Sequence, residues 1–212
     1  KKGPIHINVP FDEPLYETVE ELNDVIVNKV KQSLEEQITS SFSPRNDKIE
    51  LEKLTPIWES SVKKMILVGV HHNDNVLQEL INSFENDASV IVLTETTSNL
   101  NSDKVINSID QLIFPLSDEQ FSALQPDVLI TIGGMVVSKK MKQFLRKYQP
   151  NHHWHVDELK SMNTYHCLSE YIQQNPTNFL SKLSINSSSE STYQQDWLSK
   201  KADRAIQHQK YL

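Results

Sequence analysis

The chain has 212 residues, of which 37% are hydrophobic and 23% are charged, a balance that allows a buried core in an ordinary globular protein. The net charge of −7 argues against nucleic acid as a partner, because phosphate binding favours a basic surface. No apolar run approaches the ~20 residues that a membrane-spanning helix needs, and a total of 4 glycines argues against a glycine-rich nucleotide loop.

The first 47 residues predict a strand, a candidate helix and a linker. Residues 5–10 alternate apolar and polar side chains and end at a proline, which is typical of a short strand. Apolar positions within residues 22–38 fit a helical period imperfectly. Residues 39–47 are rich in serine and include a proline, which indicates a linker.

From residue 54 onward, short apolar runs alternate with amphipathic segments. Helices are predicted over residues 54–63 (with Pro56 in the first turn), 75–84, part of 105–113, 117–124 (with a capping box) and 138–148, and strands over 65–70, 89–94, 127–132 and 153–156. Strands separated by helices form right-handed βαβ units with a parallel sheet. We therefore expect a doubly wound α/β domain, in which helices flank a parallel sheet.

The end of the chain predicts a hinge followed by a helix. Residues 186–191 form a serine-rich, low-complexity stretch. Residues 193–211 are helical in pattern, and Trp197 and Ile206 are candidate docking residues.

The best candidate site is the turn after the strand predicted at residues 127–132. This buried run ends in Gly133 and Gly134, and the next helix begins with Ser138, Lys139 and Lys140. Glycines allow a tight turn and a close ligand approach, and a helix start offers unpaired N–H groups and a positive dipole end. We expect these five residues to bind an anionic ligand. A plain strand-to-helix turn before a solvated basic helix explains the same spacing, and the spacing alone leaves both interpretations open.

Histidines near a second strand suggest a metal site. The side chains at 153, 155 and 157 share one face of a strand, so His153, His155 and Asp157, beside His152, could converge on Zn²⁺. Polar alternation on an edge strand accounts for the same residues without a metal, and we favour that interpretation.

Two further loops lie at the same predicted sheet edge. Either His71 or His72 could act as a general base, although Asn73 or Asp74 is more simply the N-cap of the next helix. The loop at residues 94–99 carries hydroxyl, amide and carboxylate groups, which could bind a polar ligand or cap the local backbone.

The single cysteine bears on compartment rather than on catalysis. Cys167 excludes an internal disulfide and is typical of a reducing cytoplasm, so we expect a cytoplasmic protein. The sequence assigns it no base partner, and we expect it to act as a buried small hydrophobe.

Two segments together resemble thiamine-diphosphate-dependent enzymes. Residues 3–15 are similar to the G-P-V-H-(I/L)-N-x-P-(F/W) strand that joins the pyrimidine-binding domain to the central domain, and the form N-x-P-F-x-E-P-L resembles the synthase family of menaquinone biosynthesis. Residues 133–157 are similar to that family's G-G-x-x-V-S-K-R-x-K-Q-(W/F)-L stretch and the H-W-x-V-D that follows it. The chain departs from the family at Asp12 and Lys140, where arginine is common. Lys140 keeps the charge without the bidentate fork.

This resemblance implies a transferase that decarboxylates 2-oxoglutarate with thiamine diphosphate and Mg²⁺ and adds the succinyl carbanion to isochorismate. The chain would be the central domain of a cytoplasmic homo-oligomer and inactive alone. We expect no catalytic, cofactor-binding or metal-binding residue in it, because the activating glutamate and the G-D-G…N motif belong to the other two domains. In the family, basic side chains after the glycine turn line the isochorismate pocket, which here implies Lys139 first and Lys140 second.

The resemblance also divides the chain. Residues 1–16 would end the pyrimidine-binding domain, 17–53 would form a linker and connecting helix, 54–185 the central domain, and 186–212 a hinge and helix toward the next domain. Two alternatives stay open: the central domain of an enzyme of the acetolactate synthase type, which can hold FAD, and a stand-alone module that binds a small anion.

Overall fold

The computed structural model describes residues 47–187 and 189–210. The chain divides into two compact units, residues 1–44 and 45–212, and all described residues belong to the second. The strand predicted at residues 5–10 and the candidate helix at 22–38 lie outside the described residues, as does all of the predicted 39–47 linker except residue 47.

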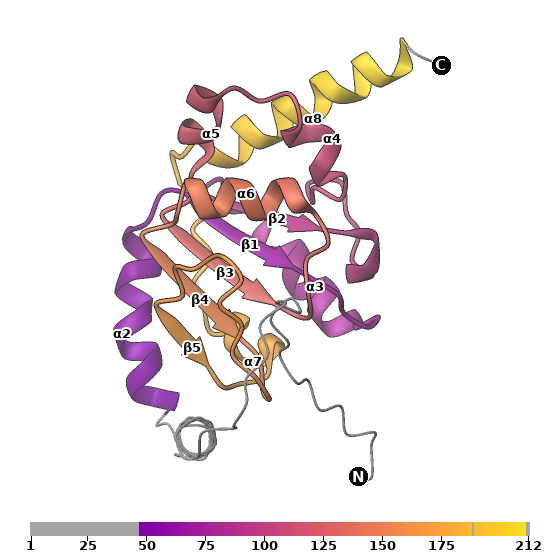
Figure 1. Cartoon of the computed structure of the whole chain (residues 1–212). Helices are drawn as coiled ribbons and strands as arrows, with labels where there is room; N and C mark the ends of the chain where they lie inside the picture. The colour runs from indigo at the N-terminus through magenta and orange to yellow at the C-terminus, as the bar shows by residue number, and fades with distance from the viewer. Residues whose placement is uncertain (1–46, 188, 211–212) are drawn as a thin grey trace, which may run out of the picture. The chain divides into compact units, whose positions relative to one another are not determined.

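Five parallel strands form one sheet in the order β2-β1-β3-β4-β5 (Figure 1). The strands are β1 Lys64–Val68, β2 Val90–Thr94, β3 Val128–Ile132, β4 His152–Val156 and β5 Glu170–Ile172. Every residue of β1, β2 and β3 is buried, because helices cover both faces of a parallel sheet. The strand order reverses between β1 and β3, the place where ligands bind in open α/β sheets.

Helices lie on both faces of this sheet (Figure 1). Those packed on one face are α2 Asp47–Ser60, α3 Asn75–Phe84 and α7 Pro176–Leu180. Those packed on the other are α4 Ile109–Ile113, α5 Asp118–Leu124, α6 Lys139–Lys147 and α8 Tyr193–Gln209, and a short 3₁₀ helix, η1 Thr96–Ser98, follows β2. The prediction of a doubly wound α/β fold is confirmed.

Helix starts follow the local sequence closely. The Asp74 carboxylate accepts hydrogen bonds from the first turn of α3, so Asp74 rather than Asn73 is the N-cap. Ser117 and Gln120 form the predicted capping box of α5. Ser138 caps α6 by accepting a bond from the Met141 N–H at 2.9 Å. Each cap satisfies backbone donors that the helix itself leaves unpaired.

Three local predictions were wrong or incomplete. Helix α2 begins at Asp47 instead of residue 54, so Pro56 lies inside the helix and not in its first turn. Leu54 and Trp58 are fully buried on either side of it, and this packing stabilises a helix that the local sequence disfavours. Strand β5 has only three residues with no clear alternation, and α7 only five, so neither was predicted.

Helix α8 packs on the same unit as the sheet. Trp197 is fully buried with Tyr193 among residues of α4 and α6, whereas Ile206 is 56% exposed. Trp197 is therefore a docking residue as predicted, and Ile206 does not dock on the described residues. The domain boundaries at residues 54 and 186 stay predictions about a longer protein.

Candidate functional site

The two glycines after β3 lie where the strand order reverses. Gly133 has a φ of +75°, a conformation that favours glycine, and the Gly134 N–H donates to the Val70 carbonyl at 2.7 Å. A Cβ on Gly69, at the end of β1, would lie 1.9 Å from the Gly134 oxygen. The close approach that these glycines permit is therefore between two backbone segments of the chain itself.

The start of α6 already holds two carboxylates. Glu95, directly after β2, accepts hydrogen bonds from the Val137 and Ser138 N–H groups, each at 2.8 Å. The Ser138 hydroxyl donates to Asp110 of α4 at 2.5 Å. Negative groups are stabilised at the positive end of a helix dipole, which explains why both acids lie here. Glu95 therefore occupies two N–H groups at this helix start, and the binding of an anionic ligand by this turn stays a prediction.

A pocket of about 360 Å³ opens beside this turn. Its lining combines Glu95 and Asp110 with hydroxyl, amide and apolar groups from η1, from α4 and the residues before it, and from the loop after β3: Thr96, Thr97, Asn107, Ser108, Ile109, Gln111, Val137 and Ser138. The sequence placed Glu95 in a loop at the sheet edge where a ligand is expected, but it gave no role to Asp110. The signal available for Glu95 was its position just past a buried strand.

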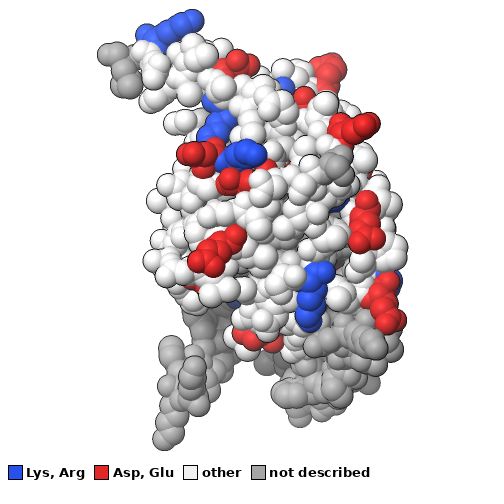
Figure 2. Space-filling model, turned by 180° about the vertical axis from the view of Figure 1, so that it is seen from behind, with Lys and Arg blue, Asp and Glu red and all other residues white. Residues whose placement is uncertain are grey.

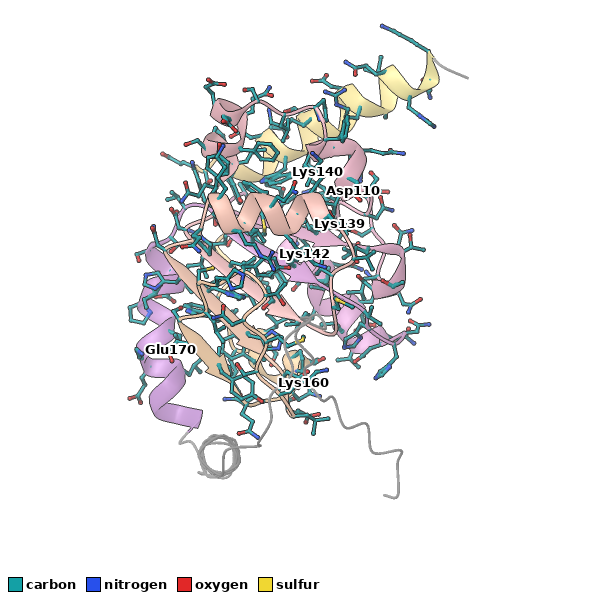
Figure 3. All side chains as sticks on the ribbon, in the orientation of Figure 1. Asp110, Lys139, Lys140, Lys142, Lys160 and Glu170 are labelled. Atoms are coloured by element: carbon teal, nitrogen blue, oxygen red, sulfur yellow. The ribbon has the colours of Figure 1, made fainter. Side chains whose placement is uncertain are left out.

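Lys139 and Lys140 follow in the first turn of α6, on the side of the fold that carries α4 and Asp110 (Figure 3). Both are exposed. The Lys140 ammonium lies 5.2 Å from the centre of the Phe114 ring, a cation–π contact. Among residues 47–187 and 189–210, the Lys139 ammonium has no ion pair or hydrogen bond. The structure therefore distinguishes the two lysines, because the Lys140 ammonium contacts an aromatic ring and the Lys139 ammonium has no such contact among the described residues.

The strand histidines form a buried hydrogen-bonded chain. The Thr131 hydroxyl lies 2.9 Å from both His153 Nε2 and His155 Nδ1, and the Cys167 sulfur lies 3.8 Å from His153 Nδ1. Asp157 instead accepts bonds from the N–H groups of a turn that follows it. The described part of the chain contains no group of three His, Cys, Asp or Glu residues that could hold a metal ion. The Zn²⁺ hypothesis is therefore not supported there.

Burial keeps these groups neutral. It lowers the pKa of His153 to about 4, with a smaller effect from a charge on His155, and it also lowers the pKa of His155. Burial raises the pKa of the half-buried Cys167 thiol. The sequence assigned this cysteine no base partner, and His153 is its neighbour. An imidazole that resists protonation beside a thiol that resists ionisation does not make a reactive thiolate.

The loop histidines serve local structure. The His71 N–H donates to the Thr97 carbonyl at 3.0 Å, and the Asn99 amide donates to the His71 carbonyl at 2.6 Å. The His71 ring lies 2.8 Å from the carbonyl of His72. These bonds join the loops after β1 and β2, and no described carboxylate orients either ring as a general base requires.

A family model described as "Middle domain of thiamine pyrophosphate" matches residues 22–211. The chain belongs to this family. A five-stranded parallel sheet with helices on both faces is consistent with such a middle domain. Within residues 47–187 and 189–210, no helix is both long and apolar enough to cross a membrane.

Relatives of this chain include three proteins named 2-succinyl-5-enolpyruvyl-6-hydroxy-3-cyclohexene-1-carboxylate synthase. The Flavobacterium johnsoniae protein is 45% identical over 184 residues, which cover 86% of this chain and 32% of that protein. The Christiangramia forsetii protein is 46% identical over 176 residues (80% and 29%), and the Flavobacterium psychrophilum protein 43% over 183 residues (84% and 31%). This thiamine pyrophosphate middle domain thus spans about a third of the length of the curated relatives it matches.

The glycine turn of this middle domain offers no open cradle for a diphosphate group. Gly69 and Gly133 pack against backbone atoms and Gly134 packs against Val70, so this turn does not open a phosphate cradle. The described residues contain no group of three His, Cys, Asp or Glu side chains that could hold a metal ion. On the face seen in Figure 2, lysine and arginine side chains stand among acidic ones without forming a continuous basic patch. No cofactor contact is therefore assigned to the described residues.

Proposed function

We propose that this chain is the central domain of a thiamine-diphosphate-dependent synthase of menaquinone biosynthesis, which decarboxylates 2-oxoglutarate and adds the succinyl carbanion to isochorismate. The observation that carries the proposal is the 43–46% identity to relatives of that name, over 80–86% of this chain. Thiamine diphosphate, with Mg²⁺, supplies the electron sink for decarboxylation, and domains outside this chain hold both. The whole enzyme is cytoplasmic and homo-oligomeric, and this chain alone is inactive.

The proposed domain boundaries follow from the same assignment. Residues 1–16 end the pyrimidine-binding domain, 17–53 connect it to the central domain at 54–185, and 186–212 lead toward the next domain. The central domain then contributes scaffold and part of the isochorismate site.

Lys139 is the residue of this chain that binds isochorismate in our proposal. Its ammonium is exposed, has no partner among the described residues, and lies at the positive end of α6, so it can pair with a carboxylate of the substrate. Gly133, Gly134 and Ser138 shape and cap the turn that presents it. Lys140 has a lesser role, because its ammonium already contacts the Phe114 ring.

Steady-state kinetics of the full-length enzyme test this assignment. Lys139→Ala should raise the KM for isochorismate by about 10-fold or more, since a hydrogen bond between charged groups contributes about 1.5–3 kcal/mol. The KM for 2-oxoglutarate should stay within about twofold, because only the second substrate loses a contact. Lys140→Ala should have the smaller effect of the two. The matched control is Lys142→Ala, which removes the same charge one turn further along α6. An equal response of both substrates, or of neither, would refute the assignment.

A further inference from the structure

The Glu95 carboxylate joins the end of one strand to the helix that follows another. Glu95 comes directly after β2, and its two oxygens accept from the consecutive N–H groups of Val137 and Ser138, which precede α6. The two hydrogen bonds join Glu95 to residues that are 42 and 43 positions further along the chain. Two bonds to one ionised group fix the orientation of the turn as well as its position.

The other end of Glu95 is also held. Its backbone N–H donates to the Ser98 hydroxyl at 2.9 Å, and that hydroxyl donates to the Val68 carbonyl at 2.7 Å. Ser98 is fully buried. The base of the Glu95 side chain is thus tied to the end of β1, and its tip to the start of α6.

Ser138 receives a second support from the opposite side. Its hydroxyl donates to Asp110 while accepting from the Met141 N–H, so both bonding directions of the oxygen are used. The residue before Lys139 is therefore held by Glu95 through its backbone and by Asp110 through its side chain. Little rotational freedom is left in the turn that places Lys139.

Because Glu95 already occupies the N–H groups at this helix start, an anionic ligand has to be bound by a lysine side chain. A carboxylate beside an anionic substrate would repel it, but the charge of Glu95 is compensated by two N–H groups and the helix dipole. The same bonds take those N–H groups away from any ligand. The remaining attraction for an anion comes from the lysines of this first turn, chiefly from the Lys139 ammonium, whose direction depends on the clamped turn.

We propose that Glu95 is a positioning residue, which fixes the start of α6 and so directs the Lys139 ammonium toward isochorismate. This inference rests on the proposed function. Glu95→Gln in the full-length enzyme keeps one acceptor oxygen but turns an NH₂ group toward the second N–H. The KM for isochorismate should rise about 3- to 10-fold, less than in Lys139→Ala, because the ammonium is misdirected but not removed, and the KM for 2-oxoglutarate should stay within about twofold. Glu95→Asp keeps both acceptors on a shorter side chain and should fall between Glu95→Gln and the native enzyme.

A double-mutant cycle separates positioning from simple structural support. If Glu95 acts through Lys139, adding Glu95→Gln to Lys139→Ala should change the KM for isochorismate no further. Glu79→Gln, which removes an exposed carboxylate from α3, is the matched control and should have no effect in either background. Thermal unfolding of each variant checks that the comparison is made between folded enzymes.

The outcomes distinguish this inference from the proposed function. A full additive effect of Glu95→Gln in the Lys139→Ala background, or an equal loss for both substrates, would overturn the positioning role. The positioning role would also be overturned if Lys139→Ala raises the KM for isochorismate and Glu95→Gln leaves it unchanged. The proposed function would still hold in that case. An unchanged KM in Lys139→Ala itself would reject the lysine assignment, and the positioning role with it.

Discussion

Lowering the pH from 7 to 4 should destabilise this domain through His153. The ring has no exposed surface, and its Nε2 shares the Thr131 hydroxyl with His155 Nδ1, both at 2.9 Å. A hydroxyl has one proton and two lone pairs, so it can donate to one ring nitrogen and accept from the other when both imidazoles are neutral. Burial, with a smaller effect from a charge on His155, lowers the pKa of His153 to about 4.

The size of the effect follows from the difference between the folded and unfolded pKa values. In the unfolded chain the pKa of this imidazole is 6.5, so between pH 6.5 and 4 the unfolded state binds the proton more readily. The stability present above pH 6.5 is therefore lost as the pH falls toward 4. One pH unit corresponds to about 1.4 kcal/mol, which gives about 3 kcal/mol for the full window. That is a large fraction of the ~5–15 kcal/mol that stabilises a typical domain.

Urea unfolding at a series of pH values measures this loss. The free energy of unfolding should fall more steeply between pH 6.5 and 4 in the native chain than in His153→Gln, which cannot bind the proton. Carboxylates titrate in both proteins, so the difference between the two slopes isolates the imidazole. Equal slopes for the native chain and His153→Gln, or a His153 NMR signal that titrates near 6.5, would refute the reasoning.

Two further substitutions test the fold around the site. Asp87→Ala should lower the free energy of unfolding by about 3 kcal/mol or more in urea at pH 7, because it leaves the buried Lys64 ammonium, 3.5 Å away, without its partner. The control Asp118→Ala breaks an exposed ion pair and should cost less than about 1 kcal/mol, and equal losses would contradict this view. Gly69→Ala should destabilise the chain by about 3 kcal/mol or more, since its Cβ would meet the Gly134 oxygen at 1.9 Å. Gly134→Ala should cost less, because its Cβ would lie 3.2 Å from the nearest atom. A larger loss of stability in Gly134→Ala than in Gly69→Ala would show that the two backbone segments do not approach each other as described.

Much of the secondary structure could be predicted because its causes are local. The helix at Asn75–Phe84 was predicted with its bounds, since its apolar period and the Asp74 cap lie within a few residues of each other. The capping box of Ser117 and Gln120 is equally local. Buried strands were recognisable as apolar runs because both faces of a parallel sheet are covered. Pro56 misled the prediction, because a proline suggests a helix start when the burial of its neighbours is unknown.

The sequence by itself determined the α/β fold, the glycine turn and the lysines after it, because periodicity, capping and glycine conformation act over short stretches of chain. Only the tertiary structure decided what those groups touch. Strands β2 and β3 are separated by β1 in the sheet, yet Glu95 after β2 reaches the N–H groups that follow β3. Which of the two lysines contacts an aromatic ring depends likewise on where the exposed Phe114 side chain lies. These partners follow from the order of strands and the placement of helices, which no local pattern encodes.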